Sequence, residues 1–232
     1  MRRNYFHFKQ FSVANSLSPM PLTTDSVLIG AWCDVANCVR ALDVGTGCGI
    51  IALMLSQRNQ DLDVDAIDID EGSIQEAQEN FKLSKWGSRI SVTKADFNDW
   101  TGDYDLIVSN PPFFTNGIKS PNVSRAEARH THTLTLDQLI VHGRELLGTF
   151  GKLAFITPGD IVSKVIEHAT FASMSISRMC EVVSVEGKSP KRIMWELTPS
   201  QTFLQRERIT LRNSDGTLSE AYRSLCQEFY LD

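Results

Sequence analysis

A run of glycines follows the first short apolar strand that the sequence predicts. The run is Leu42-Asp43-Val44-Gly45-Thr46-Gly47-Cys48-Gly49, with a Gly-x-Gly-x-Gly spacing. Glycines at a turn from strand to helix allow the backbone to approach a ligand closely. The spacing differs from the Gly-x-Gly-x-x-Gly of dinucleotide sites, and with the preceding Asp43 it favours a ligand with a ribose and a zwitterionic tail. A sharp turn without a ligand has the same pattern, so the glycines alone leave both interpretations open.

Acidic residues follow the next two predicted strands. Asp68 ends the second strand, 21 residues after Gly47, where an acid can accept hydrogen bonds from both hydroxyl groups of a ribose. Asp70 is a second candidate, although it also suits the first turn of the following helix. After the third strand, Asp96 can accept from an exocyclic amine and Phe97 can stack on a base. A polar turn with one buried phenylalanine explains that last pair equally well.

The sequence Asn110-Pro111-Pro112-Phe113 stands directly after the fourth predicted strand. Ligands of doubly wound sheets bind at the carboxyl ends of the strands. The prolines restrict the backbone, so the side-chain oxygen of Asn110 and the carbonyl of Pro111 can converge on one planar amine, while Phe113 stacks on its ring. Two acceptors on the amine hydrogens favour a pyramidal, nucleophilic nitrogen. With the upstream motifs in place, this chemistry is favoured over a rigid proline turn.

The elements that must position these residues alternate between apolar strands and amphipathic helices. Strands are predicted over 41–44, 64–69, 90–94, 104–109 and 152–156, and later extended segments over 176–185, 192–197 and 203–211. Helices are predicted over 25–36, 50–57, 72–83, 135–147, 161–169 and 220–229. This alternation predicts an α/β fold with a doubly wound, mostly parallel, seven-stranded sheet. The turn 186–190 predicts an antiparallel hairpin at its edge, and residues 114–133 are expected to form a long loop.

Helix starts are predicted from capping residues. Thr24 or Asp25 is expected to cap the first helix. Thr135 and Gln138 form the pattern of a capping box at the start of the helix near 135–147.

Length and composition indicate a globular chain. It has 232 residues, 42% hydrophobic and 22% charged, which excludes a disordered, collagen-like or coiled-coil protein. We expect a single domain over 1–232, with an N-terminal arm and helix over 1–36 and a core with the C-terminal hairpin and helix over 37–232. The longest apolar run, Ile50 to Leu55, is too short for a membrane helix, and the first ten residues lack the apolar region of a signal peptide.

The net charge of −5 conceals an uneven distribution. Residues 61–105 contain twelve acids and four bases, whereas residues 1–20 and 185–213 are net basic. A phosphate backbone would favour the basic segments, although chance clustering on a solvated surface explains charge runs as well. The five cysteines include no Cys-x-x-Cys pair, so we expect neither a disulfide framework nor a metal site. The reducing cytoplasm is the expected compartment.

The order of the motifs resembles that of class I S-adenosylmethionine-dependent methyltransferases of the N6-adenine or glutamine-N5 type. Over its whole length the chain resembles more closely the bacterial valine tRNA (adenine-37-N6) methyltransferase family. The segments that carry this second resemblance are Phe6-His7-Phe8-Lys9-Gln10-Phe11, Thr24-Asp25-Ser26-Val27-Leu28-Ile29-Gly30-Ala31-Trp32, Ala128-Arg129-His130, Lys188-Ser189-Pro190-Lys191-Arg192 and Phe229-Tyr230-Leu231. The chain departs from the family pattern at Met20-Pro21-Leu22, where a lysine and a valine are expected after the methionine.

The resemblance implies methylation of the exocyclic N6 of adenine 37, next to the anticodon of a valine tRNA, with S-adenosylmethionine as the cofactor. The implied catalytic residues are Asn110, Pro111, Pro112 and Phe113. The implied cofactor-binding residues are Thr24, Asp43, Gly45, Gly47, Gly49, Asp68, Asp96, Phe97 and Asn110. The expected RNA contacts are Phe114, Arg125, Arg129, Lys188, Lys191 and Arg192. The expected partner is therefore a tRNA anticodon loop, bound by a cytoplasmic monomer that does not associate with membranes.

Three other functions stay open at the level of sequence. A glutamine-N5 methyltransferase of release factors uses the same Asn-Pro-Pro motif. It usually has tyrosine where this chain has Phe113, and it carries an additional N-terminal helical domain. An rRNA guanine-N2 methyltransferase generally has a duplicated domain, which 232 residues cannot hold. A non-catalytic RNA-binding module with a vestigial cofactor pocket would be marked by the loss of Asn110 or Asp68, and both are present.

Overall fold

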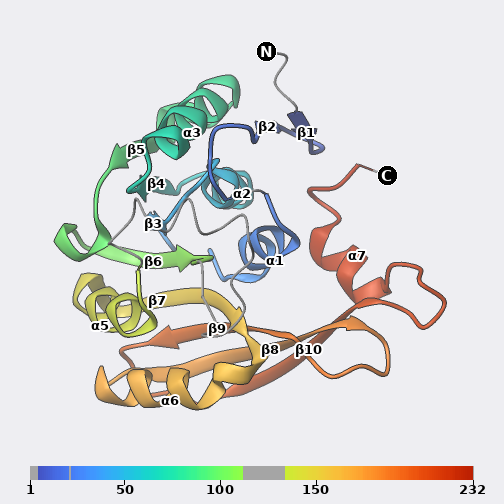
Figure 1. Cartoon of the computed structure of the whole chain (residues 1–232). Coiled ribbons are helices and arrows are strands. Elements are labelled where there is room, and N and C mark those ends of the chain that lie inside the picture. The colour runs from blue at the N-terminus through green and yellow to red at the C-terminus, as the bar shows by residue number, and fades with distance from the viewer. Residues whose placement is uncertain (1–4, 21, 112–133, 232) are drawn as a thin grey trace.

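The computed structural model describes residues 5–20, 22–111 and 134–231. The strands of its main sheet are β3 (Arg40–Val44), β4 (Asp63–Asp68), β5 (Ile90–Lys94), β6 (Tyr104–Ser109), β7 (Leu147–Pro158), β8 (Ser175–Val185), β9 (Arg192–Thr198) and β10 (Gln205–Arg212). They form one eight-stranded sheet in the order β10-β8-β9-β7-β6-β3-β4-β5, with helices on both sides (Figure 1). The α/β doubly wound fold predicted from the alternating pattern is confirmed.

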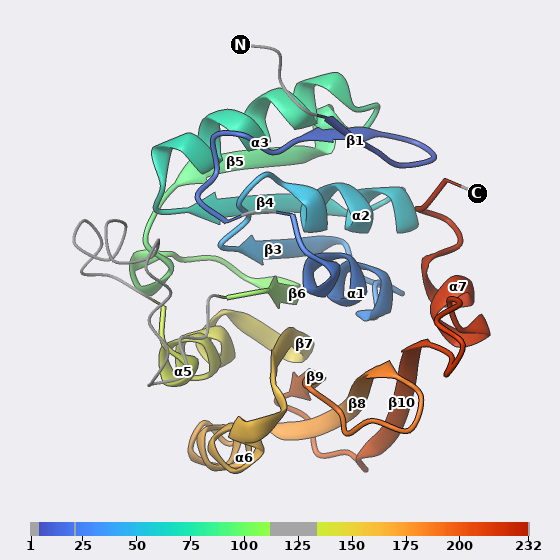
Figure 2. The same ribbon diagram turned by 45° about the vertical axis from the view of Figure 1, so that its right-hand side comes forward.

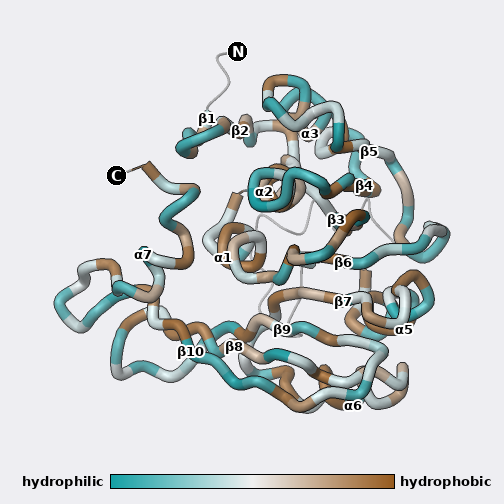
Figure 3. The backbone as a smooth tube through the Cα atoms, turned by 180° about the vertical axis from the view of Figure 1, so that it is seen from behind, coloured by the Kyte–Doolittle hydropathy of each residue, from teal (hydrophilic) through white to brown (hydrophobic). Residues whose placement is uncertain are grey.

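Each face of the sheet has its own helices and its own core. The helices on one face are α1 (Thr24–Trp32), α2 (Ile50–Arg58), α3 (Glu71–Leu83) and α7 (Glu220–Cys226), and those on the other are α5 (Leu136–Leu146) and α6 (Val162–Phe171). Short 3-10 helices are η1 (Gly87–Arg89), η2 (Phe97–Asp99) and η3 (Gly159–Ile161). Figure 3 shows hydrophobic segments in β3 and β4, as expected for strands covered on both faces. Within the described ranges, no helix is long and apolar enough to cross a membrane.

The sheet has one strand more than the seven predicted, and its antiparallel strand does not lie at the edge. β9 lies between β7 and β8 and is antiparallel to both. The predicted hairpin is therefore present, but β10 forms the edge and pairs with β8 in parallel. Because β9 ends beside the start of β8, residues 199–204 need only pass β8 before β10 runs in the same direction.

The strand order reverses at β3. β4 pairs with one side of β3 and β6 pairs with the other, and both pairings are parallel. Open α/β sheets bind ligands at the carboxyl ends of the strands, at such a switch point. The carboxyl ends of β3, β4 and β6 are Val44, Asp68 and Ser109, so this edge brings together the glycine run, Asp68 and Asn110.

One of the two predicted helix caps is confirmed and the other is wrong. α5 begins at the Thr135–Gln138 capping box, as predicted. α1 is capped by Thr23, whose hydroxyl accepts a hydrogen bond from the Ser26 N–H, so Thr24 and Asp25 lie inside its first turn. The predicted loop 114–133 lies outside the described residues.

The first described residues form an arm that lies along α3 (Figure 2). Its strands β1 (Tyr5–His7) and β2 (Ser12–Ala14) make a small antiparallel sheet. Beyond β2, the buried carboxylate of Glu76 on α3 accepts hydrogen bonds from the N–H groups of residues 16–18, at distances of 2.6 to 3.1 Å. Glu76 therefore fixes the arm along the helix.

A second polar side chain of α3 connects the arm to the glycine run. Asn80 is fully buried. Its Oδ1 accepts from the Ala14 N–H at 2.9 Å, and its Nδ2 donates to the carbonyls of Ala14 and Cys48 at 3.0 and 2.8 Å. Asn80 thus satisfies backbone groups of two segments that are distant in the sequence.

We predict that Asn80→Ala lowers the free energy of unfolding by at least about 2 kcal/mol, because it leaves buried backbone donors and acceptors without partners. The matched control is Gln78→Ala on the exposed side of the same helix, which we expect to change it by less than about 0.5 kcal/mol. Urea unfolding of the three proteins measures both values. Equal stabilities of the two variants would show that the arm does not depend on Asn80.

Candidate active site

The glycine run forms the turn from β3 to α2 and contains left-handed backbone. The φ angles of Gly45, Gly47 and Gly49 are 70°, 55° and 83°, values that residues with a Cβ rarely adopt. A Cβ at Gly45 would meet no atom within 4 Å, whereas a Cβ at Gly49 would lie 2.4 Å from the ring of Phe81. Gly45 therefore faces open space that a ligand can fill, and Gly49 permits close packing of α2 on α3.

Asp43 is fully buried and supports the loop without lining the pocket. Its Oδ2 accepts from the Thr46 hydroxyl at 2.6 Å and from the Ala52 N–H at 3.2 Å. Gly49, the N-cap residue of α2, has no side chain that could accept a hydrogen bond from the start of the helix. Asp43 supplies this acceptor instead. Its Oδ1 has no hydrogen-bond partner in the described part of the chain. Burial raises the pKa of Asp43 to about 7, against the hydrogen bonds from Thr46 and Ala52.

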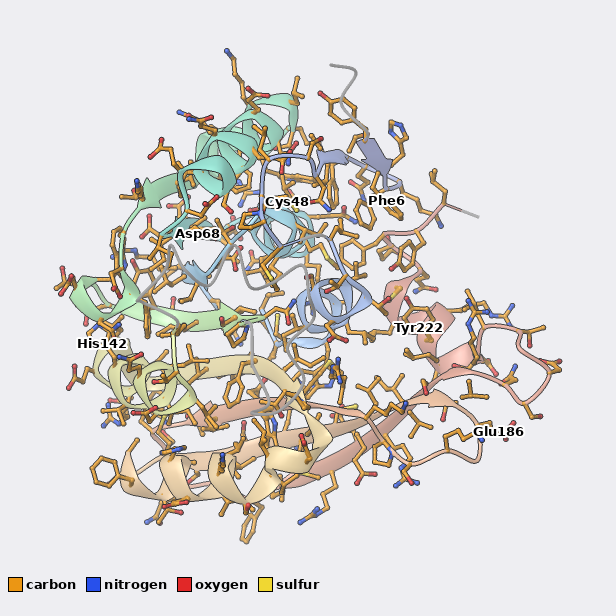
Figure 4. The ribbon with its side chains drawn as sticks, in the orientation of Figure 1. Phe6, Cys48, Asp68, His142, Glu186 and Tyr222 are labelled. Carbon is orange, nitrogen blue, oxygen red and sulfur yellow. The ribbon has the colours of Figure 1, made fainter. Side chains whose placement is uncertain are left out.

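Asp68 joins the loops that follow β3 and β4. Its Oδ2 accepts from the Gly47 N–H and its Oδ1 from the Asp70 N–H, both at 2.9 Å. Asp68 lines the pocket, and Figure 4 shows it in the interior of the molecule, as it does Cys48 of the glycine run. Burial raises the pKa of Asp68 above its ordinary value, although the hydrogen bonds from Asp70 and Gly47 oppose the shift. A carboxylate oxygen has more than one acceptor position, so Asp68 can also accept from ligand hydroxyls.

Two further acids beside the pocket cap helices. Asp70 accepts from the Ser73 N–H at the start of α3, and Asp96 accepts from the Asn98 N–H at the start of η2. Both acids line the pocket, together with the buried ring of Phe97. Asp70 is therefore the N-cap of α3 and precedes the first turn that the sequence suggested for it, and Asp96 and Phe97 lie together beside Asp68.

The carboxamide of Asn110 is held by the first turn of α1. Its Nδ2 donates to Ser26 Oγ at 2.9 Å and lies 3.5 Å from Thr23 Oγ1. Asn110, Pro111 and Ser26 line the same pocket as Asp68. The sequence did not indicate Thr23 or Ser26, because hydroxyl residues at a helix cap carry no signal of pairing with a distant asparagine. Pro112 and Phe113, which are predicted to be catalytic, lie outside the described residues.

The N-terminal arm supplies an apolar wall. Pro19, Met20 and Leu22 line the pocket, as does Leu134. The hydrogen bonds from residues 16–18 to Glu76 bring this part of the arm to the strand ends. In the sequence, Met20 and Leu22 were noted only because their segment departs from the family pattern. No local signal indicates that they line a pocket.

The other predicted site residues lie away from the pocket or outside the described ranges. Thr24, which the resemblance assigns to the cofactor, is exposed and does not line the pocket. The predicted RNA contacts outside the described residues are Phe114, Arg125 and Arg129.

The loop between β8 and β9 carries the remaining predicted RNA contacts. Lys188 and Lys191 are exposed, and Figure 4 shows Glu186 of this loop at the periphery of the molecule. Arg192 is half-buried, and its Nε donates to Asp25 Oδ2 at 2.8 Å. Because β9 is antiparallel to β7, it begins at the edge where the parallel strands end. Arg192 thus connects this edge to the turn of α1 that holds Asn110.

These residues fit the cofactor expected from the sequence. S-adenosylmethionine combines an adenine, a ribose and a zwitterionic amino acid tail. The open face at Gly45 provides space for a ligand next to Asp68, whose carboxylate suits ribose hydroxyls. Phe97 offers a ring for stacking, and Asp96 an acceptor for an amine.

The fold and this pocket define a Rossmann-like methyltransferase, and the comparisons agree. The model of the methyltransferase small domain family matches residues 33–175. Over nearly its full length, the chain belongs to the tRNA1(Val) (adenine(37)-N6)-methyltransferase family. A relative of that name from Vibrio vulnificus (strain CMCP6) is 40% identical, covering 97% of this chain and 95% of the relative. Relatives from Parabacteroides distasonis and Klebsiella pneumoniae (strain 342) are 39% and 37% identical and cover 100% and 99% of this chain, and 99% and 96% of their own lengths.

Solved structures share the fold at lower sequence identity. A predicted O-methyltransferase from Agrobacterium tumefaciens has a TM-score of 0.69 and 15% identity, with 88% of this chain and 96% of that chain covered. A ribosomal protein L11 methylase from Lactobacillus delbrueckii subsp. bulgaricus has a TM-score of 0.54 and 21% identity, with 77% and 79% covered. Both support the fold alone.

We predict that Asp68→Ala weakens the binding of S-adenosylmethionine by about 1.5–3 kcal/mol, because it removes charged hydrogen bonds to the ligand and the acceptor of the Gly47 N–H. Isothermal titration of the protein with the cofactor measures this change and does not require tRNA. Asp63→Ala, at the exposed start of the same strand, is the matched control and should bind as the parent does.

The raised pKa of Asp68 predicts that the binding of S-adenosylmethionine depends on pH. Because the pKa of Asp68 is raised, the carboxylate takes up a proton at a higher pH than usual and loses acceptor capacity on acidification. Affinity should therefore fall as the pH decreases through this raised pKa, and Asp68→Asn should reduce that dependence. Parental affinity in Asp68→Ala would contradict the assignment and favour Asp70.

Proposed function

We propose that this protein transfers the methyl group of S-adenosylmethionine to the exocyclic N6 of adenine 37 in a valine tRNA. One observation carries the proposal: Asn110 and Pro111 line the same pocket as the glycine run and Asp68. An acceptor for an amine thus lies in the pocket that fits the methyl donor. The names of the full-length relatives supply the same substrate.

The chemistry that this pocket supports is activation of a weakly nucleophilic amine. The lone pair of an exocyclic N6 is delocalised into the adenine ring. The Asn110 oxygen and the Pro111 carbonyl can accept hydrogen bonds from the amine hydrogens, which favours a pyramidal nitrogen. Bound S-adenosylmethionine supplies a methyl group on a positively charged sulfur. No general base is required before transfer, because the proton can leave the product ammonium to water.

We propose the cofactor-binding roles from the positions of these residues in and beside the pocket. Asp68 accepts from the ribose hydroxyls, Asp96 from the adenine amine, and Phe97 stacks on the base. Gly45 and Gly47 let the loop approach the amino acid tail, while Gly49 lets α2 pack on α3. We propose that buried Asp43 keeps that loop in shape. The apolar wall of the pocket suits the target base, and it includes Met20, Leu22 and Leu134.

We further propose that tRNA approaches along the edge where the parallel strands end. The predicted stacking residues Phe113 and Phe114 and the predicted contacts Arg125 and Arg129 belong to this proposal from the sequence alone. Lys188 and Lys191 are exposed at the same edge and can meet phosphates. A base in an anticodon loop must be splayed out before its amine can reach the pocket. The chain acts as a single domain and as a cytoplasmic monomer in this proposal.

We predict that Asn110→Ala lowers the rate of methyl transfer roughly 10²–10³-fold while cofactor affinity stays near the parental value. This range is typical of the loss of one preorganised transition-state partner. Single-turnover methylation of valine tRNA, followed by mass spectrometry of the nucleosides, measures the rate and identifies the product. Asn110→Asp keeps an acceptor oxygen and should retain measurable activity.

Two results would contradict this mechanism. One is a parental rate for Asn110→Ala. The other is a methyl group on a ring carbon rather than on N6.

We predict that the double variant Lys188→Gln/Lys191→Gln weakens tRNA binding and lowers its salt dependence by about 1.5 units of slope, because each of two lost phosphate contacts no longer releases a counterion. Arg192 is left intact, since its ion pair with Asp25 would confound the result. Filter binding at several salt concentrations gives the slope, and cofactor affinity should not change. Lys82→Gln, on α3, is the control. A parental slope in the double variant would show that this loop does not contact RNA.

A further inference from the structure

The hydroxyl of Ser26 is placed to orient the carboxamide of Asn110, to which we assign the role of accepting a hydrogen bond from the target amine. Ser26 is 7% exposed and lies in the first turn of α1. It accepts from Asn110 Nδ2 at 2.9 Å. Neither the sequence nor the resemblance indicated a role for its side chain.

The hydroxyl group is itself fixed by the cap of α1. Thr23 Oγ1, the N-cap acceptor, lies 3.2 Å from Ser26 Oγ and accepts from the Ser26 N–H at 3.3 Å. The same Thr23 oxygen lies 3.5 Å from Asn110 Nδ2. The NH₂ group of Asn110 therefore faces two hydroxyl oxygens on a helix turn.

This arrangement matters because a carboxamide has two chemically different ends. Its oxygen accepts from an amine, whereas its NH₂ group can only donate. If the group turned over, NH₂ would face the target amine, and two donors would oppose each other. With NH₂ directed to Ser26 and Thr23, the oxygen is the end left for the substrate.

We propose that Ser26 is a positioning residue, which acts through Asn110 to present the carboxamide oxygen to the target amine. This inference rests on the proposed function, because it takes the assigned role of Asn110 as given. A transition-state acceptor contributes most when it is oriented before the reaction. The first turn of α1, which is joined to β9 by the Asp25–Arg192 ion pair, suits this task because it belongs to a helix rather than to a loop.

The first test needs neither cofactor nor tRNA. The side-chain NH₂ signals of Asn110 are assigned in ¹H–¹⁵N NMR spectra of the parent by their absence in Asn110→Ala. In Ser26→Ala these signals should move toward the positions of solvent-exposed asparagines. Ser84→Ala, which removes a hydrogen-bonded hydroxyl at the end of α3, should leave them in place. Unchanged signals in Ser26→Ala would overturn the inference.

The second test separates a positioning role from a structural one. Ser26→Ala should lower the single-turnover rate about tenfold, as expected for an outer partner of a reactive group, with unchanged cofactor affinity. Because Ser26 acts through Asn110, the double variant Ser26→Ala/Asn110→Ala should be no slower than Asn110→Ala. Additive losses of rate, or a parental rate for Ser26→Ala, would overturn the inference.

The two tests also distinguish this inference from the proposed function. If the parental protein methylates no adenine in tRNA, the proposed function fails, and the positioning role of Ser26 in that reaction fails with it. The NMR result then still decides whether Ser26 orients the carboxamide. If the parent is active and the NMR signals do not respond, only the inference about Ser26 fails.

Discussion

The carboxylate of Asp68 connects the ends of two adjacent parallel strands, and the pocket depends on this connection. It accepts the N–H of Gly47 after β3 and the N–H of Asp70 after β4. Backbone donors that are withdrawn from water require a partner, so neither loop can shift without losing a bond. In the proposed function the same carboxylate also accepts the ribose hydroxyls. Its charge therefore serves the shape of the pocket and ligand binding together.

A second buried carboxylate makes the pocket depend on a segment that is distant in the sequence. Burying Glu76 is costly unless its oxygens are hydrogen-bonded, and the N–H groups of residues 16–18 provide those bonds. The arm that gains this anchor then supplies Met20 and Leu22 to the pocket wall. The buried carboxylate of Glu76 on α3 thus determines where the arm places its apolar side chains at the strand ends.

The parts of the structure that were predictable from the sequence have local signals. The glycine run, Asp68 and Asn110 each follow a predicted strand, and the ends of parallel strands meet at one edge. The contacts of Glu76 and Ser26 depend instead on pairs of residues 58 and 84 positions apart, for which spacing along the chain gives no signal. The position of β10 was missed for a related reason: an extended segment shows its conformation in the sequence but not its neighbour in the sheet.

The first turn of α1 contacts both Asn110 in the pocket and a residue at the surface of the molecule. Ser26 contacts Asn110 on one side, and Asp25 contacts Arg192 on the other. The helix behind this turn is packed closely, since a Cβ at Gly30 would lie 2.9 Å from the sulfur of Met54. A guanidinium that is half-buried and paired with Asp25 has less freedom to follow a phosphate than an exposed lysine. We infer that Arg192 serves the geometry of this turn, whereas the exposed Lys188 and Lys191 of the same loop can meet the phosphates of a nucleic acid.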